Sequence, residues 1–129
     1  MQNLPAEISV VAAAAVCGCL GTAIAFRAVT GKPASTIALN WRKHVWSIIF
    51  VMPVLFLIYV PLPKSVTLLV AIVWLIMGPS VAAKYFFGSK DTPWSFLLML
   101  HSAFAFTTTA AIVTLHHLLG LPLSMAMEN

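Results

Sequence analysis

Long apolar stretches separated by short polar segments make up almost the whole chain. A membrane-spanning helix needs about 20 mostly apolar residues, and four stretches reach or approach that length. We therefore predict four transmembrane helices, over residues 8–28, 45–62, 66–87 and 94–119. Helix-breaking Gly and Pro residues stand at the joints, within residues 31–33, 61–63 and 88–93. The predicted fold class is all-α, and residues 1–129 form a single transmembrane domain.

The composition agrees with a protein whose main solvent is lipid. Hydrophobic residues make up 61% of the 129 positions and charged residues only 8%, with a formal net charge of +4. Soluble domains carry about 25% charged residues, so this chain has too few charges to coat a water-facing surface. The basic residues do not form a patch with interleaved aromatic residues, so nucleic acid is not a predicted partner.

The distribution of Lys and Arg predicts the orientation in the membrane. Six basic residues belong to the first and third loops and their flanks: Arg27, Lys32, Arg42, Lys43, Lys84 and Lys90. Lys64 alone belongs to the opposite side. Because basic loops stay in the cytoplasm, we expect loops 29–44 and 88–93 to be cytoplasmic and both termini to be non-cytoplasmic. This arrangement is typical of a multi-pass protein of a bacterial or organellar inner membrane.

Small residues predict which helices approach closely, because lipid provides no hydrophobic drive between them. The first span carries Ala14, Gly18 and Thr22 along one stripe, and the fourth carries Ala103 and Thr107. We expect these two helices to pack against each other or against partner copies, while the second and third face lipid. Four short spans bury little among themselves, so the predicted partners are the bilayer, other membrane subunits and copies of this chain.

Histidines are the candidates for binding a cofactor. His101 lies about 10 Å inside the fourth span at 1.5 Å per residue, where it is expected to hydrogen-bond inside an interface. Haem or chlorophyll ligation by His101 is a second interpretation, which the spacing of the four histidines does not favour. His116 and His117 are expected to face headgroups or water. No metal site is predicted, because Cys17 and Cys19 have no third ligand nearby.

A transport path has its own candidates. Gly78, Pro79 and Ser80 are expected to interrupt the third helix, either as an ordinary structural kink, since proline is common in membrane helices, or as a transporter-type binding site. Lys84, about one turn from the cytoplasmic end of that helix, either extends its ammonium group to the lipid headgroups or is a contact for an anion. Thr108, at the middle of the fourth span, either bonds back to its own helix or lines a polar path.

These features leave two functional hypotheses open. Because the predicted spans contain no Asp or Glu and the chain has no recognisable catalytic motif, an enzyme is not predicted. The favoured interpretation is a small non-catalytic subunit of a larger membrane complex, such as a respiratory or photosynthetic one, that packs, stabilises or positions a cofactor. The alternative is a small homo-oligomeric transporter or channel for a small, anionic solute.

Overall fold

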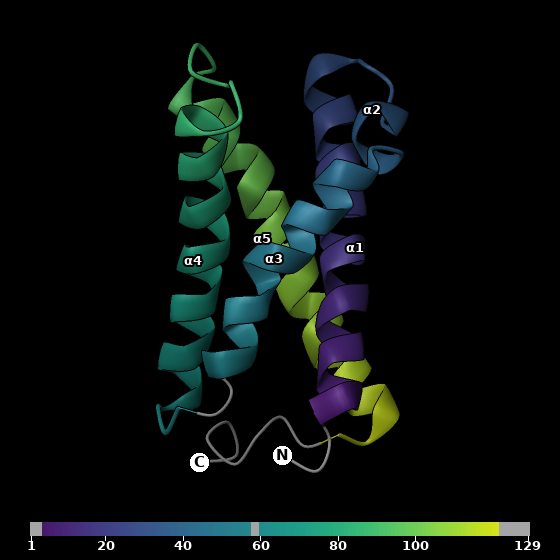
Figure 1. Cartoon of the computed structure of the whole chain (residues 1–129), viewed down its shortest axis with the longest axis vertical. Coiled ribbons are helices and arrows are strands. Elements are labelled where there is room, and N and C mark those ends of the chain that lie inside the picture. The colour runs from purple at the N-terminus through teal and green to yellow at the C-terminus, as the bar shows by residue number, and fades with distance from the viewer. Residues whose placement is uncertain (1–3, 58–59, 122–129) are drawn as a thin grey trace.

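The computed structural model describes residues 4–57 and 60–121, and these residues form helices joined by short turns (Figure 1). The helices are α1 (Leu4–Thr30), α2 (Ser35–Ala38), α3 (Trp41–Leu57), α4 (Lys64–Tyr85) and α5 (Trp94–Leu119). The predicted all-α fold class is confirmed for the described residues. The fourth predicted span coincides with α5, whereas α1 and α4 differ from their predicted bounds by a few residues at each end.

The four longer helices alternate in direction, so the molecule has two distinct ends (Figure 1). One end, at the top of the view, holds the last turn of α1, the α2 segment and the connection from α4 to α5. It carries the six basic residues of the first and third loops, and it is called the basic end below. The opposite end holds the first turn of α1, the last turn of α5 and the connection from α3 to α4.

Three of the described helices, α1, α4 and α5, are long and apolar enough to cross a membrane. Helix α3 has 17 residues, which correspond to about 25 Å of rise. The predicted second span, 45–62, is therefore wrong at both ends: α3 begins at Trp41, and residues 60–63 are not helical. Residues 58–59 lie outside the described part. Val60 and Leu62 each precede a proline, a position that disfavours helical backbone, and this accounts for the non-helical stretch.

The interruption predicted in the third span does not occur, because α4 continues through Gly78, Pro79 and Ser80. Pro79 lacks the N–H that would bond the Leu75 carbonyl oxygen, a loss that membrane helices generally tolerate. The Ser80 hydroxyl donates to the Ile76 carbonyl oxygen at 2.6 Å. The unwound backbone that would have pointed to a transporter-type binding site is therefore absent from α4.

Helix α1 packs closely on α5, as the small residues predict. An ideal Cβ built on Gly18 would overlap the Thr108 hydroxyl and the Phe104 ring, and one built on Gly21 would overlap Thr107. Only the absence of a side chain at these two positions permits this helix separation. The adjoining core combines small and branched residues from all four longer helices, including Val11, Ala14, Val51, Leu75 and Ala105.

Candidate functional site: a cavity at the basic end

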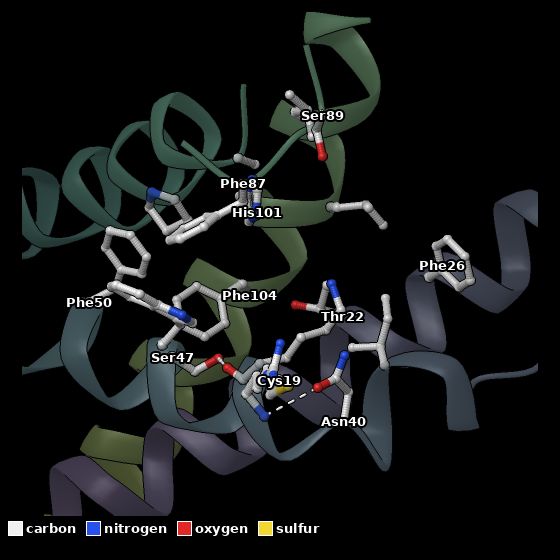
Figure 2. A pocket seen from close by; sticks show the side chains of 18 of the residues that line it. Cys19, Thr22, Phe26, Asn40, Ser47, Phe50, Phe87, Ser89, His101 and Phe104 are labelled. Carbon is white, nitrogen blue, oxygen red and sulfur yellow. Dashed lines mark hydrogen bonds between the residues drawn. The ribbon is translucent and has the colours of Figure 1, made fainter. Parts of the chain in front are cut away.

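A cavity of about 580 Å³ lies between α1–α3 and the α4–α5 hairpin, toward the basic end (Figure 2). Every helix and the α4–α5 connection contribute to its lining. The polar residues of the lining are Cys19, Thr22, Thr36, Asn40, Arg42, Lys43, Ser47, Ser89, Thr92 and His101. Asp and Glu are missing among the described residues that line it. The cavity therefore combines positive charge with neutral hydrogen-bonding groups.

The deepest polar groups come from three helices. Cys19 and Thr22 belong to α1, Ser47 to α3 and His101 to α5, and Figure 2 shows His101 across the cavity from Cys19 and Ser47. The Thr22 hydroxyl already donates to the Gly18 carbonyl oxygen at 3.0 Å, and the Ser47 hydroxyl to the Lys43 carbonyl oxygen at 2.7 Å. These two oxygens can therefore act only as acceptors toward a ligand.

His101 is held by α4 through Ser80, whose Oγ lies 2.8 Å from His101 Nδ1. The Ser80 hydroxyl has one proton, which it donates to the Ile76 carbonyl oxygen. Ser80 must therefore accept its second hydrogen bond from Nδ1–H of His101. With Nδ1 committed, Nε2 is the ring nitrogen left to meet a ligand. The sequence predicted a hydrogen-bonding His101 inside an interface, and the structure confirms that role, with Ser80 as the partner.

Aromatic side chains close the side of the cavity between α3 and α4. The Trp46 ring lies 4.6 Å from the Phe87 ring and 6.2 Å from the Phe50 ring, measured between centroids. Trp74 continues this row at 6.5 Å from Phe50, and its indole N–H donates to the Phe50 carbonyl oxygen at 2.8 Å. That carbonyl belongs to the turn before Pro53, where the missing proline N–H weakens the helix.

The rim at the basic end is built by the α2 segment and the start of α3. Asn40 Oδ1 accepts the backbone N–H of Arg42 at 3.1 Å, which begins α3. His44 Nε2 lies 2.6 Å from the Ala38 carbonyl oxygen and ties α3 back to the end of α2. Arg42 and Lys43 are exposed and line the cavity. The rim therefore presents two cations on a backbone fixed by local hydrogen bonds.

The predicted path residues on α4 divide into two groups. Pro79 lines the cavity, and Ser80 supports His101 beneath it. Gly78 instead faces its own helix, where the Trp74 ring is the nearest group. Lys84 Nζ donates to the Thr92 carbonyl oxygen and lies 5.6 Å from the centroid of the Trp94 ring. Lys84 thus secures the α4–α5 connection behind the cavity rather than lining it.

Thr108, the remaining predicted path residue, lies deeper than the cavity. It is fully buried against Gly18, and its hydroxyl has no hydrogen-bond partner among the described residues. The expected bond back to its own helix is therefore not formed. Thr108 packs with Phe104 against Gly18 and does not line the cavity. The structure therefore does not bring Thr108 together with His101 in one site.

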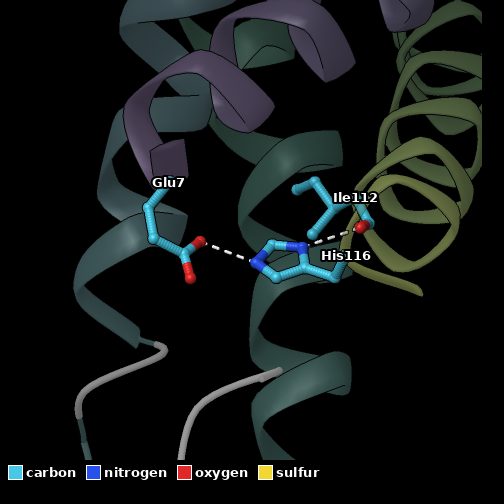
Figure 3. A network of polar contacts seen from close by, with 3 residues as sticks. All are labelled: Glu7, Ile112 and His116. Carbon is cyan, nitrogen blue, oxygen red and sulfur yellow. Dashed lines mark hydrogen bonds and ion pairs between the residues drawn. The ribbon is translucent and has the colours of Figure 1, made fainter. Parts of the chain in front are cut away.

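The structure contradicts the expected position of His116, which is fully buried and faces Glu7 at 2.6 Å (Figure 3). Its neighbour His117 is exposed, as expected. Glu7 directly precedes the predicted first span, where the sequence suggests only an interaction with the dipole of the helix N-terminus, yet it shares a helical face with Val10, Val11 and Ala14. That spacing of i, i+3, i+4 and i+7 is the sequence signal that could have revealed its burial.

His, Cys, Asp and Glu side chains form no group of three that could hold a metal ion among the described residues. Comparisons with protein-family models, curated proteins and solved structures find no match for this chain. Its function must therefore be argued from the cavity itself.

Proposed function

We propose that the protein crosses a membrane four times and binds a small anionic solute in the cavity at its basic end, as one step of transport. Support for the fourth crossing comes from the connectivity: α1 ends at the basic end, and α4 begins at the opposite end. The connecting chain must traverse the same thickness, and α3 provides that segment. The excess of basic residues at one end supports a cytoplasmic position for it, with both termini on the other side.

The lining of the cavity is the observation that carries the assignment to an anion. Arg42 and Lys43 stand at its rim, and the described lining contains no carboxylate that would repel an anion. His101 Nε2 is a hydrogen-bond acceptor, because the ring proton is on Nδ1, so it suits a donor group of the ligand rather than its acidic group. Aromatic rings from Phe26, Trp46, Phe50 and Phe104 surround the polar groups. This combination fits a ligand with one acidic group and an apolar or aromatic body.

Binding of simple aromatic anions tests this proposal. Benzoate, benzenesulfonate and phenyl phosphate are titrated into the protein in lipid nanodiscs, with benzyl alcohol and benzylamine as neutral and cationic counterparts, and binding is measured by calorimetry. An anion about 4 Å from an exposed cation gains about 1 kcal/mol in a water-like dielectric. Replacing both Arg42 and Lys43 by Gln should therefore weaken anion binding about 30-fold.

The matched control is the double replacement Arg27→Gln and Lys32→Gln. These residues are exposed, belong to the same end and do not line the cavity. Their removal lowers the net charge by the same amount and should change the affinity far less. An equal loss in both double variants would assign the effect to the general field of the basic end. Equal affinity for benzoate and benzyl alcohol would also overturn an anion site.

The favoured sequence interpretation, a non-catalytic subunit of a larger complex, stays a prediction. Broad apolar faces of α3, α4 and α5 are exposed in the single chain, with Phe56, Leu69 and Phe106 among the most exposed side chains. Such faces suit lipid and a protein partner equally well. Purification in mild detergent distinguishes the two hypotheses: a complex subunit should co-purify with other chains in fixed proportion.

A further inference from the structure

A buried acid–base pair joins the two chain segments that meet at the end opposite the cavity. Glu7, in the first turn of α1, and His116, in the last turn of α5, are 109 positions apart in sequence. Glu7 Oε2 lies 2.6 Å from His116 Nε2, and the side chains are 6% and 0% exposed. Ionisable groups buried at membrane depth are costly and usually serve a function.

The hydrogen bonds of His116 determine how many protons the pair holds. His116 Nδ1 lies 2.8 Å from the Ile112 carbonyl oxygen, which can only accept, so Nδ1 carries a proton (Figure 3). One further proton must lie between Nε2 and the Glu7 carboxylate, because two lone pairs would otherwise face each other at 2.6 Å. The pair is then net neutral, whether this proton resides on nitrogen or on oxygen.

Loss of that shared proton would leave a negative charge without a partner at this position. Among the described residues at this end, the other ionisable side chains are Lys64 on α4 and His117 on α5, and both are exposed. The lower half of α3, residues 51–57, contains no ionisable side chain. A buried carboxylate with no cation beside it is strongly unfavourable, so loss of the proton favours movement of Glu7 toward water.

We propose that Glu7 and His116 form a proton-binding site that holds the ends of α1 and α5 together while it contains one shared proton. When this proton passes to water, the hydrogen bond breaks and the two helix ends separate. The Gly18 and Gly21 contacts with α5 lie three to four turns away along α1 and remain in place. This inference rests on the proposed anion-binding function in one respect. If the cavity binds an anion for transport, binding or loss of the shared proton would control whether the opposite end of the protein is closed or open.

The distance between spin labels on α1 and α5 tests this proposal without any ligand. Cys17 and Cys19 are replaced by Ala, and Ile8 and Leu118, which are 41% and 72% exposed, are replaced by Cys and labelled. Electron paramagnetic resonance then gives the distance distribution in nanodiscs at acidic and alkaline pH. A single short distance is expected at acidic pH, and a second, longer population should grow as the pH rises.

Two variants remove the titration while retaining a hydrogen bond. In Glu7→Gln the amide N–H donates to His116 Nε2, and in the double variant Glu7→Gln with His116→Gln the N–H of one amide donates to the carbonyl oxygen of the other. Both should keep the short distance at every pH, and the second variant serves if the first does not fold. His117→Gln is the matched control, because it removes an exposed histidine one position away. It should retain the pH dependence of the parent protein.

Two results would overturn the proton site: a parent distance that does not depend on pH, or Gln variants that keep the parent's pH dependence. Neither result bears on anion binding, which is measured separately at the basic end. Conversely, loss of the anion-binding proposal would leave the spin-label result intact. The two proposals therefore fail independently.

Discussion

Replacement of Gly18 by Ala tests the close contact on which the α1–α5 pair depends. The added methyl group would overlap the Thr108 hydroxyl and the Phe104 ring. Both partners are buried, so the collision cannot be relieved by turning a side chain into solvent. Forcing an extra methyl group into a packed core costs about 1–3 kcal/mol, and the helices must separate or repack.

A second glycine in the chain isolates this cost. Gly78 lies within α4, where an added Cβ would meet only the Trp74 ring at 3.5 Å, an ordinary van der Waals distance. The gain in helix propensity from Gly to Ala, about 1 kcal/mol, is common to both sites. Gly18→Ala should therefore be less stable than Gly78→Ala by about 1–3 kcal/mol.

Reversible unfolding in mixed micelles with increasing sodium dodecyl sulfate measures both variants and the parent protein. The double variant Gly18→Ala with Thr108→Ala should recover part of the loss, because it removes one of the two colliding groups. The reasoning would be refuted if Gly18→Ala were as stable as Gly78→Ala. A stability loss that Thr108→Ala leaves unchanged would assign the whole collision to Phe104.

Two further replacements test the groups that support the cavity. Trp74→Phe removes the indole N–H that donates to the Phe50 carbonyl oxygen, so the free energy of unfolding should fall by about 1 kcal/mol. An unchanged unfolding curve would show that this hydrogen bond does not stabilise α3. Lys84→Met keeps the aliphatic stem and removes the bond to the Thr92 carbonyl oxygen. Because Lys84 does not line the cavity, benzoate affinity should change much less than in the Arg42 and Lys43 double variant; an equal loss would place Lys84 at the anion site.

Much of the fold could be predicted because it depends on local sequence. Apolar run length set the positions of α1, α4 and α5, and Gly31 and Gly120 end α1 and α5 with a backbone of positive φ. The alternation of basic and non-basic connections predicted the basic end. Small residues predicted the contact between α1 and α5. Each of these signals is carried by residues close together in the chain, so no tertiary information was needed.

The candidate sites depended on contacts between residues far apart in sequence. His101 could be identified as a polar residue in an apolar helix, but its partner Ser80 was visible only once α4 lay beside α5. The sequence suggests Lys84 as a contact for an anion, but in the structure its ammonium group donates a hydrogen bond to the Thr92 carbonyl oxygen. In the sequence, Arg42 and Lys43 indicate only the orientation of the protein in the membrane. Their position at the rim of a cavity depends on how α3 crosses the other helices.

The sequence by itself determined the solvent and the path of the chain: apolar runs must be helical in lipid, where every backbone group needs an internal partner. Only the tertiary structure decided which rare polar side chains meet. Glu7 and His116 stand near the two ends of the described chain, each at the margin of an apolar run, and neither position indicates that the other is its partner. Packing of α1 on α5 brings them to 2.6 Å and removes them from water. This juxtaposition turns two marginal residues into one proton site.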